Sequence, residues 1–238
     1  LAGSEENLQR MMGFLIDRYA DGPRAALRGQ LKTHSPIEYP DVGLYDPSLK
    51  RGISDDLKDL PRAPRGCRGT VGILIMRSYA LAGNAGHYDA VISALRERGL
   101  RVITAFASGL DARPAVEKYF IEDGQPVVDA VLSLTGFSLV GGPAYNDSKA
   151  AEDMLARLDV PYLAAHALEF QSLEQWEASE NGLMPIEATM MVAIPELDGA
   201  TGPMVFGGRS DAAEGSSEHD MRAHPERVDV LAGRVERL

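Results

Sequence analysis

An apolar run from Val71 to Met76 most constrains what this chain can fold into. The run is rich in β-branched side chains and too short for a free-standing helix, so it predicts a strand buried on both faces, as in a parallel sheet. A loop of glycine, alanine and asparagine follows, and His87 then leads into a segment with helical periodicity. Strand, glycine-bearing loop and helix start are typical of the first turn of an α/β unit, where such folds place ligands.

The same alternation of apolar run and helical period continues along the chain. It predicts strands at 71–76, 101–106, 127–133, 161–165 and 203–206, and helices at 86–98, 113–122, 147–158, 172–179 and 185–194. Strands and helices that alternate at this spacing are joined by right-handed crossovers and form a parallel sheet. The predicted fold class is therefore α/β, with a doubly wound, mainly parallel Rossmann/flavodoxin-like sheet preceded by an N-terminal helical and extended segment.

The segments on either side have different patterns. Residues 5–20 carry apolar side chains at helical spacing, and Ser4 is a suitable N-cap. Prolines and glycines without a sustained period fill residues 35–69, which predicts an extended connector. A polar, acidic stretch from Ser210 to Pro225 predicts a mobile loop. We expect three parts: an N-terminal helix plus Pro/Gly-rich connector at 1–69, an α/β domain at 70–209, and an acidic loop with a C-terminal helix at 210–238 that leads to the rest of a longer subunit.

Composition excludes several classes of function. The 238 residues include 35 acidic and 24 basic side chains, a formal net charge of −11, so nucleic acid or an anionic membrane would be repelled. No apolar run reaches the roughly 18 residues of a membrane span, and no signal peptide is visible. The single cysteine, Cys67, excludes an internal disulfide and is compatible with the cytoplasm, where we expect the protein. Because the chain begins at Leu1 rather than Met, we expect an excised piece of a longer protein.

The predicted fold places candidate ligand-binding residues at one edge of the sheet, because ligands bind beyond the carboxyl ends of parallel strands. Loops after the predicted strands deliver polar side chains to that edge: His87, Asp111, Asn146, His166 and Glu169. The usual nucleotide motifs are absent, since there is no G-x-x-x-x-G-K-[ST] loop and Gly83–Gly86 lacks the G-x-G-x-x-G spacing. There is also no G-x-S-x-G elbow and no H-E-x-x-H motif.

Three features have both a functional and a structural interpretation. His87, at the start of a predicted helix, is either a neutral base or ligand, or a residue that caps the helix. Glu196 and Asp198 follow an apolar helix; as carboxylates they can accept a proton or hold a hard cation, while solvated turn acids are the simpler interpretation. The glycine-rich loop at 134–146 either lets the backbone approach a ligand or packs its own apolar side chains.

Several long runs resemble the large H subunit of magnesium chelatase. They are MRSYALAGNAGHYDAVISALRERGLRVITAFASGLDARPAVEKYF at 76–120, VVDAVLSLTGFSLVGGPAYND at 127–147, LDVPYLAAHALEFQSLEQW at 158–176 and MMVAIPELDGATGPMVFGGRSD at 190–211. The upstream YADGPRAAL and YPDVGLYDPSL fit the same family, so the resemblance extends over nearly the whole chain. The large subunit of cobaltochelatase is similar in outline, but GHYD and SLTGFSLVGGPA are closer to the magnesium, bacteriochlorophyll-pathway type.

The resemblance implies an internal fragment of a porphyrin-binding catalytic subunit, inactive alone, whose whole is a ligase that forms nitrogen–metal bonds. That subunit inserts Mg²⁺, its substrate, into protoporphyrin IX in (bacterio)chlorophyll biosynthesis. ATP is hydrolysed by separate AAA+ partner subunits, which fits the missing phosphate loop, and the remaining domains of the large subunit are further partners.

The resemblance also implies roles for individual residues. Glu196 and His87 are the expected catalytic residues, and we expect them to face each other; Glu196 and Asp198 are the expected metal ligands. The expected substrate-binding residues are Phe137, Leu139, Asn146, Glu169 and Gln171. Two alternatives stay open: the same architecture inserts cobalt into a corrinoid, or the segment is a non-catalytic scaffold that docks the ATPase partners.

Overall fold

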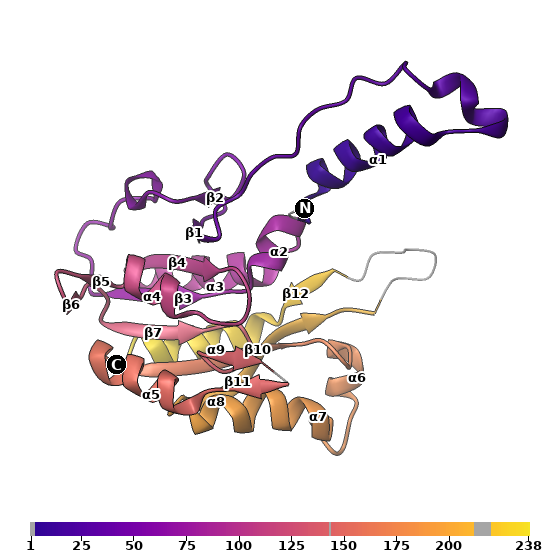
Figure 1. Cartoon of the computed structure of the whole chain (residues 1–238). Coiled ribbons are helices and arrows are strands. Elements are labelled where there is room, and N and C mark those ends of the chain that lie inside the picture. Colours follow the sequence, from indigo (N-terminus) through magenta and orange to yellow (C-terminus); the bar gives the residue numbers. More distant parts are fainter. Residues whose placement is uncertain (1–2, 143, 212–219) are drawn as a thin grey trace.

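The computed structural model describes residues 3–142, 144–211 and 220–238, and a central sheet organises them (Figure 1). Eight strands of the described residues form this sheet in the order β12–β11–β10–β7–β3–β4–β1–β2. Their bounds are β1 Val42–Tyr45, β2 Ile53–Ser54, β3 Thr70–Leu74, β4 Arg101–Ala107, β7 Ala130–Ser133, β10 Tyr162–Leu168, β11 Thr201–Arg209 and β12 Met221–Ala223. Two short hairpins lie outside it: β5 Ile121–Glu122 with β6 Gln125–Pro126, and β8 Gly141–Gly142 with β9 Tyr145–Asn146.

The five central strands are parallel and confirm the predicted fold class. Strand β3 pairs in parallel with both β4 and β7, and β10 pairs in parallel with β7 and β11. In chain order these strands lie in the sequence 2-1-3-4-5, which is the flavodoxin-like arrangement of a doubly wound sheet. The order reverses between β3 and β7, so the fold has its topological switch point there.

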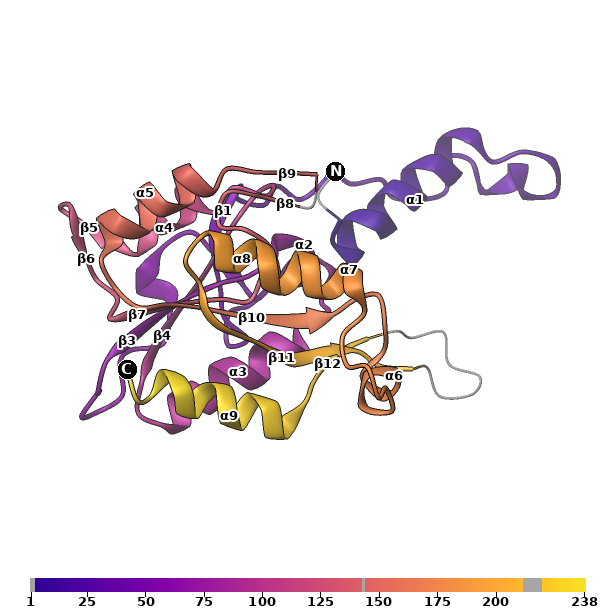
Figure 2. The ribbon, with the colours of Figure 1, turned by 90° about the horizontal axis from the view of Figure 1, so that it is seen from below.

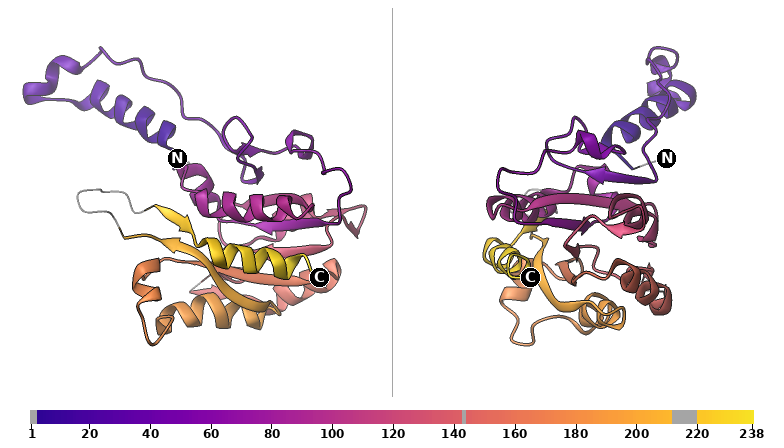
Figure 3. Two further views of the ribbon diagram at one scale, coloured as in Figure 1. Left: turned by 180° about the vertical axis from the view of Figure 1, so that it is seen from behind. Right: turned by 90° about the vertical axis from the view of Figure 1, so that its left-hand side faces the viewer.

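Helices cover both faces of the sheet (Figures 2 and 3). Helices α3 (Gly86–Glu97) and α9 (Pro225–Val235) lie on one face, and α4 (Arg113–Tyr119), α5 (Ser148–Leu158), α7 (Pro185–Ala188) and α8 (Ile194–Leu197) lie on the other. Alternate residues of β3 divide between the two cores: Ile73 packs with the α3 side, and Leu74 packs with the α4 side. Right-handed crossovers explain the division, because only the β3-to-β4 connection runs in the reverse direction across the sheet.

The sheet extends beyond residues 70–209 at both ends. Strand β1, inside the predicted connector, pairs antiparallel with β4, and β12 pairs antiparallel with β11. The connector prediction is therefore wrong for residues 42–45, whose short strand between Pro40 and Pro47 shows no sustained period. Part of the predicted mobile loop, Met221–Ala223, is likewise a strand, while 212–219 lie outside the described residues.

Two further differences concern helices. The segment expected as a loop after β3 contains α2 (Arg77–Ala82), which ends at Gly83 with φ +71°. The helix expected at 185–194 is divided into α7, a π-helical turn at Thr189–Ala193, and α8. Pro195 accounts for the division, because it lacks the N–H that an α-helix would use to bond the carbonyl four residues earlier. A short helix α6 (Leu173–Glu177) begins at a Ser172 capping box.

The N-terminal helix α1 (Glu5–Tyr19) projects from the body as an arm (Figures 1 and 3). The hydroxyl of Ser4 accepts a hydrogen bond from the Asn7 N–H, as expected for an N-cap. The helix is followed by a 3₁₀ turn at Gly22–Leu27. Within the described residues, no helix is long and apolar enough to cross a membrane.

Candidate functional site

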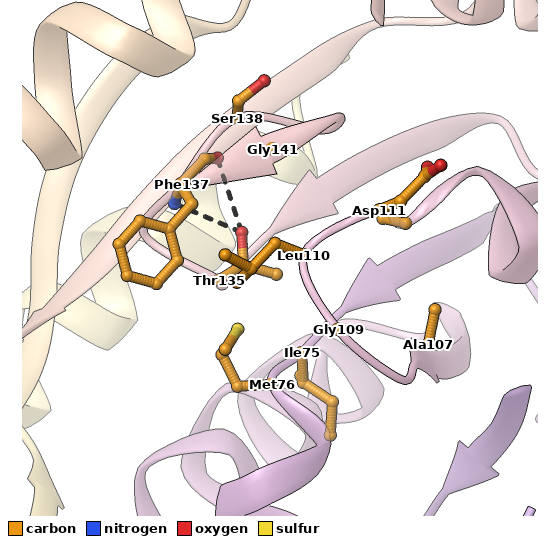
Figure 4. A pocket seen from close by; sticks show the side chains of 11 residues that line it. Ile75, Met76, Ala107, Gly109, Leu110, Asp111, Thr135, Phe137, Ser138 and Gly141 are labelled. Atoms are coloured by element: carbon orange, nitrogen blue, oxygen red, sulfur yellow. Dashed lines mark hydrogen bonds between the residues drawn. The ribbon is translucent and has the colours of Figure 1, made fainter. Parts of the chain in front are cut away.

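A crevice lies at the topological switch point, beyond the carboxyl ends of β3, β4 and β7 (Figure 4). Its narrower part measures about 20 Å³ and is lined by the last residue of β4 and by the segments that follow the three strands: Ile75, Met76, Ala107, Gly109, Leu110, Asp111, Ala112, Thr135, Phe137, Ser138 and Gly141. A more open pocket of about 470 Å³ continues from it along α2 and shares Met76, Ala107, Gly109 and Leu110. We call the two together the switch-point crevice. It is the place where this sheet topology puts a ligand.

One wall of the crevice is the loop that follows β7, residues 135–141, which we call the crevice loop. The Thr135 hydroxyl accepts from the Phe137 N–H (3.3 Å), and the Ser138 hydroxyl accepts from the Val140 N–H (3.1 Å). Gly141 has φ +124°, and a Cβ there would lie 2.3 Å from the carbonyl oxygen of Tyr145. The tight turn into the β8–β9 hairpin therefore requires glycine at this position.

A buried carboxylate holds the crevice loop from behind. Asp198 is 3% exposed, and its Oδ2 accepts a hydrogen bond of 2.7 Å from the Leu139 N–H. Its Oδ1 has no hydrogen-bond partner among the described residues. Burial raises the pKa of Asp198, while the Leu139 N–H and the nearby Ser138 hydroxyl act in the opposite direction by stabilising the charged form.

Two arginines are engaged by protein acceptors here: Arg77, which lines the open part of the crevice, and Arg113, which follows Ala112 of the crevice lining. The Arg113 guanidinium makes a bidentate pair with Asp111, with an Nη2–Oδ2 distance of 2.6 Å, and this hydrogen bonding lowers the pKa of Asp111. Arg77 donates from Nε to the Pro40 carbonyl (3.0 Å) and from Nη2 to the Tyr39 carbonyl (3.2 Å). Arg77 thus ties the start of α2 to the segment that leads into β1.

A tyrosine–glutamate hydrogen bond links two of the loops at this edge. The Tyr79 hydroxyl, on α2, donates to Glu169 Oε1 over 2.6 Å, and Glu169 directly follows β10. Burial, together with Glu169, raises the pKa of the Tyr79 hydroxyl. The hydrogen bond therefore ties α2 to the loop that follows β10.

His87 lies in an aromatic cluster and does not face Glu196. Its ring is fully buried and lies 5.3 Å from the Tyr79 ring, 3.8 Å from Tyr88 and 5.8 Å from Phe206. Neither ring nitrogen has a hydrogen-bond partner among the described residues, and burial lowers its pKa to about 3. Glu196 is exposed on α8, on the opposite face of the sheet (Figure 2). The expectation that the two face each other is wrong, because α3 and α8 belong to crossovers of opposite direction.

The structure brings only part of the predicted substrate-binding set to the crevice. Phe137 lines it, half-buried. Leu139 is 1% exposed and packs in the core instead. Asn146 is half-buried in β9, Glu169 is bonded to Tyr79, and Gln171 is buried with an Nε2 that has no hydrogen-bond partner among the described residues. Within the described residues no three His, Cys, Asp or Glu side chains gather where they could hold a metal ion.

Several residues at this edge were not predicted from the sequence. Met76 and Leu110 form much of the crevice; Met76 ends the predicted strand 71–76 and Leu110 lies in the loop after the predicted strand 101–106, and these positions could have identified them. Glu187 is fully buried on α7, and its Oε1 accepts from the N–H groups of Phe170 (3.1 Å) and Gln171 (3.3 Å). No pattern in the sequence distinguishes this buried acid from a solvated one in the first turn of a helix.

A flavodoxin-like parallel sheet covered by helices on both faces, with a crevice at its switch point, defines a doubly wound α/β protein. The chain also matches the family model CobN/Magnesium Chelatase over residues 1–238, and it belongs to that family. It is 49% identical to the magnesium-chelatase H subunit of Cereibacter sphaeroides, in an alignment that covers 100% of this chain and 21% of that protein. It is 38% identical to the chloroplastic magnesium-chelatase ChlH subunit of Oryza sativa, with coverage of 99% and 17%.

A solved structure supports the same assignment. The chain is similar to the catalytic subunit of cobaltochelatase from Mycobacterium tuberculosis, with a TM-score of 0.65, 25% sequence identity, and coverage of 98% of this chain and 18% of that one. The chain therefore spans about a fifth of the length of these relatives. The family expected from the sequence is confirmed.

Proposed function

We propose that this chain is part of the subunit that inserts Mg²⁺ into protoporphyrin IX, and that its switch-point crevice contacts the macrocycle. The observation that carries the proposal is the apolar surface that Met76, Leu110 and Phe137 present at the switch point. A porphyrin is a flat, largely apolar ring, so apolar and aromatic side chains in a crevice suit it. The magnesium-chelatase relatives support porphyrin rather than another flat ligand.

Metal insertion requires that Mg²⁺ lose water, which it does reluctantly, and that two pyrrole N–H groups lose their protons. Two protons leave as the ion takes their place, so the porphyrin complex gains no net charge. Glu196 suits both tasks: its exposed carboxylate can bind the ion transiently and accept a proton. Asp198, the other predicted metal ligand, is 3% exposed and does not line the crevice, so we assign transient ion binding to Glu196. His87 stays a predicted base, but it is fully buried and burial lowers its pKa to about 3, so its ring would have to become accessible to solvent before it could accept a pyrrole proton.

The energy for this reaction comes, in this proposal, from ATP hydrolysed by separate AAA+ subunits. The chain's lack of a phosphate-binding loop motif agrees with that division of labour. The remaining parts of the large subunit are then required to complete the site.

A charge introduced into the crevice tests the proposal. In the full-length subunit, we expect Leu110→Glu and Phe137→Glu each to weaken protoporphyrin IX binding by about tenfold or more, because each buries an unpaired carboxylate against an apolar ring. Binding is measured by titrating porphyrin and following its fluorescence. Val230→Glu is the matched control, since Val230 is about as exposed as Leu110 but lies on α9. Unchanged binding by both crevice variants would show that the macrocycle binds elsewhere.

Cobalt insertion into a corrinoid is the second candidate, favoured by the similarity to a cobaltochelatase catalytic subunit. The two candidates differ in ligand. Binding of protoporphyrin IX and of a cobalt-free corrinoid to the same full-length subunit separates them, and we expect the porphyrin to bind more tightly.

A further inference from the structure

We propose that Asp198 is a positioning residue that fixes the crevice loop and thereby sets the affinity of the crevice for its ligand. Asp198 itself does not line the crevice. It lies behind the loop, in the turn between α8 and β11, where its carboxylate accepts the Leu139 N–H. The proposal rests on the proposed function for the identity of the ligand, but its structural part does not.

The backbone N–H and carbonyl of Leu139 are the centre of a series of hydrogen bonds that joins both walls of the crevice. Its N–H donates to Asp198, and its carbonyl accepts the N–H of Ala112 over 2.9 Å, in the loop after β4. On the same side, the Gly141 N–H donates to the Leu110 carbonyl over 2.7 Å. Residues 111 and 140 form an isolated antiparallel bridge between these contacts. The loops after β4 and β7 therefore behave as one bonded unit, and Asp198 anchors that unit to the turn before β11.

The choice of an acid at position 198 supports a positioning role. A carboxylate that is only 3% exposed loses most of its hydration, a cost that an apolar side chain would not incur. That cost is offset in part by the 2.7 Å hydrogen bond that the carboxyl oxygen accepts from the Leu139 N–H. Without it, that N–H would be buried with no acceptor, and the loop would have to move to find one. Phe137 and Ser138, which line the crevice, would move with it.

The test compares three variants of the full-length subunit. Asp198→Ala removes the acceptor, and Asp198→Asn keeps a neutral oxygen that can accept the same N–H. Asp46→Ala is the matched control, because Asp46 is buried to a similar extent and is paired with Arg96. Asp46 follows β1, which runs antiparallel to β4, so it lies away from the carboxyl end of β4 where the crevice is. Hydrogen exchange of peptides that contain residues 135–141 reports on the loop, and porphyrin titration reports on the crevice.

We expect Asp198→Ala to accelerate exchange in the crevice loop and to raise the dissociation constant for protoporphyrin IX by about tenfold. We expect Asp198→Asn to bind porphyrin within about twofold of the unchanged subunit, because the hydrogen bond rather than the charge holds the loop. We expect Asp46→Ala to lower stability without either local effect.

Three outcomes would overturn the inference: unchanged loop exchange in Asp198→Ala, equal weakening by Asp46→Ala, or loss of binding in Asp198→Asn, which would indicate that the charge acts directly. If the unchanged subunit binds no porphyrin, the proposed function fails, while the exchange measurement still decides whether Asp198 holds the loop. If Asp198→Ala does not fold, porphyrin titration of Asp198→Asn still decides whether the hydrogen bond or the charge of Asp198 maintains ligand binding.

Discussion

Two buried histidines make the stability of this protein depend on pH. Burial lowers the pKa of His87 to about 3 and that of His166 to about 4. Both values lie below the ~6.5 of a solvated histidine, so below that pH the unfolded chain binds protons that the folded protein does not. The stabilisation is complete above about pH 6.5 and is lost as pH falls, by up to about 1.4 kcal/mol per pH unit for each histidine.

Removing one of these rings should reduce that dependence. We expect His166→Leu to lower the slope of unfolding free energy against pH between about 6 and 4.5, because one fewer group binds a proton on unfolding. Urea unfolding at several pH values measures the slope. His34→Leu is the matched control, since it removes an exposed histidine by the same substitution. An equal slope for both variants would mean that His166 is protonated in the folded protein.

Residue patterns predicted which side chains follow the strands, but not which of these side chains lie close together in the folded protein. His87 lies on the helix between β3 and β4, and Glu196 lies on the helix before β11. Their separation depends on the order of strands, since the direction of each right-handed crossover decides which face receives its helix. Strand order results from pairing between segments that are distant in the sequence, so the local residue pattern does not determine it. Leu139 was misplaced for a similar reason, because a loop's apolar residues can point into the core as readily as toward a ligand.

At the scale of elements, uninterrupted apolar runs were the reliable signal. Strands β3, β4 and β10 are buried along nearly their whole length, and their sequences show it. The short strand β1 and the three-residue β12 were missed because they are stabilised by pairing with β4 and β11 rather than by their own patterns. Helix α2 was missed because its glycine- and asparagine-containing end resembles a loop.

The crevice loop should be sensitive to a small substitution at Gly141. We expect Gly141→Ala to destabilise the protein by about 1–3 kcal/mol, because φ +124° is strained for alanine and the added Cβ would lie 2.3 Å from a backbone oxygen. We expect Gly13→Ala to stabilise it by about 0.5–1 kcal/mol, since Gly13 lies inside α1 with open space around it. Urea midpoints of the two variants measure both effects. A Gly141→Ala midpoint equal to that of the unchanged chain would mean that the hairpin turn is not needed for folding.

For the whole molecule, the size of the crevice limits what this segment can do alone. Its narrower part of about 20 Å³ has room for about one water molecule, and the wider pocket beside it is open to solvent. A macrocycle placed there would remain exposed on much of its surface. The exposed Glu196 carboxylate is likewise on a different face from the buried His87. The relative from Cereibacter sphaeroides is about five times as long as this chain, and under the proposed function other parts of such a subunit would have to enclose the reacting atoms.

We therefore expect the isolated chain not to insert Mg²⁺ into protoporphyrin IX, even with ATP and the AAA+ partners, while the full-length subunit does. The physical reason is that dehydrating Mg²⁺ and removing pyrrole protons require a site closed to water with its groups fixed around the ring. Formation of Mg-protoporphyrin, followed by its fluorescence, measures the reaction for both proteins. In the full-length subunit, Glu196→Ala should reduce the rate at least about tenfold. Rapid insertion by the isolated chain would place the complete catalytic site within these residues, and a fully active Glu196→Ala subunit would remove Glu196 from the mechanism.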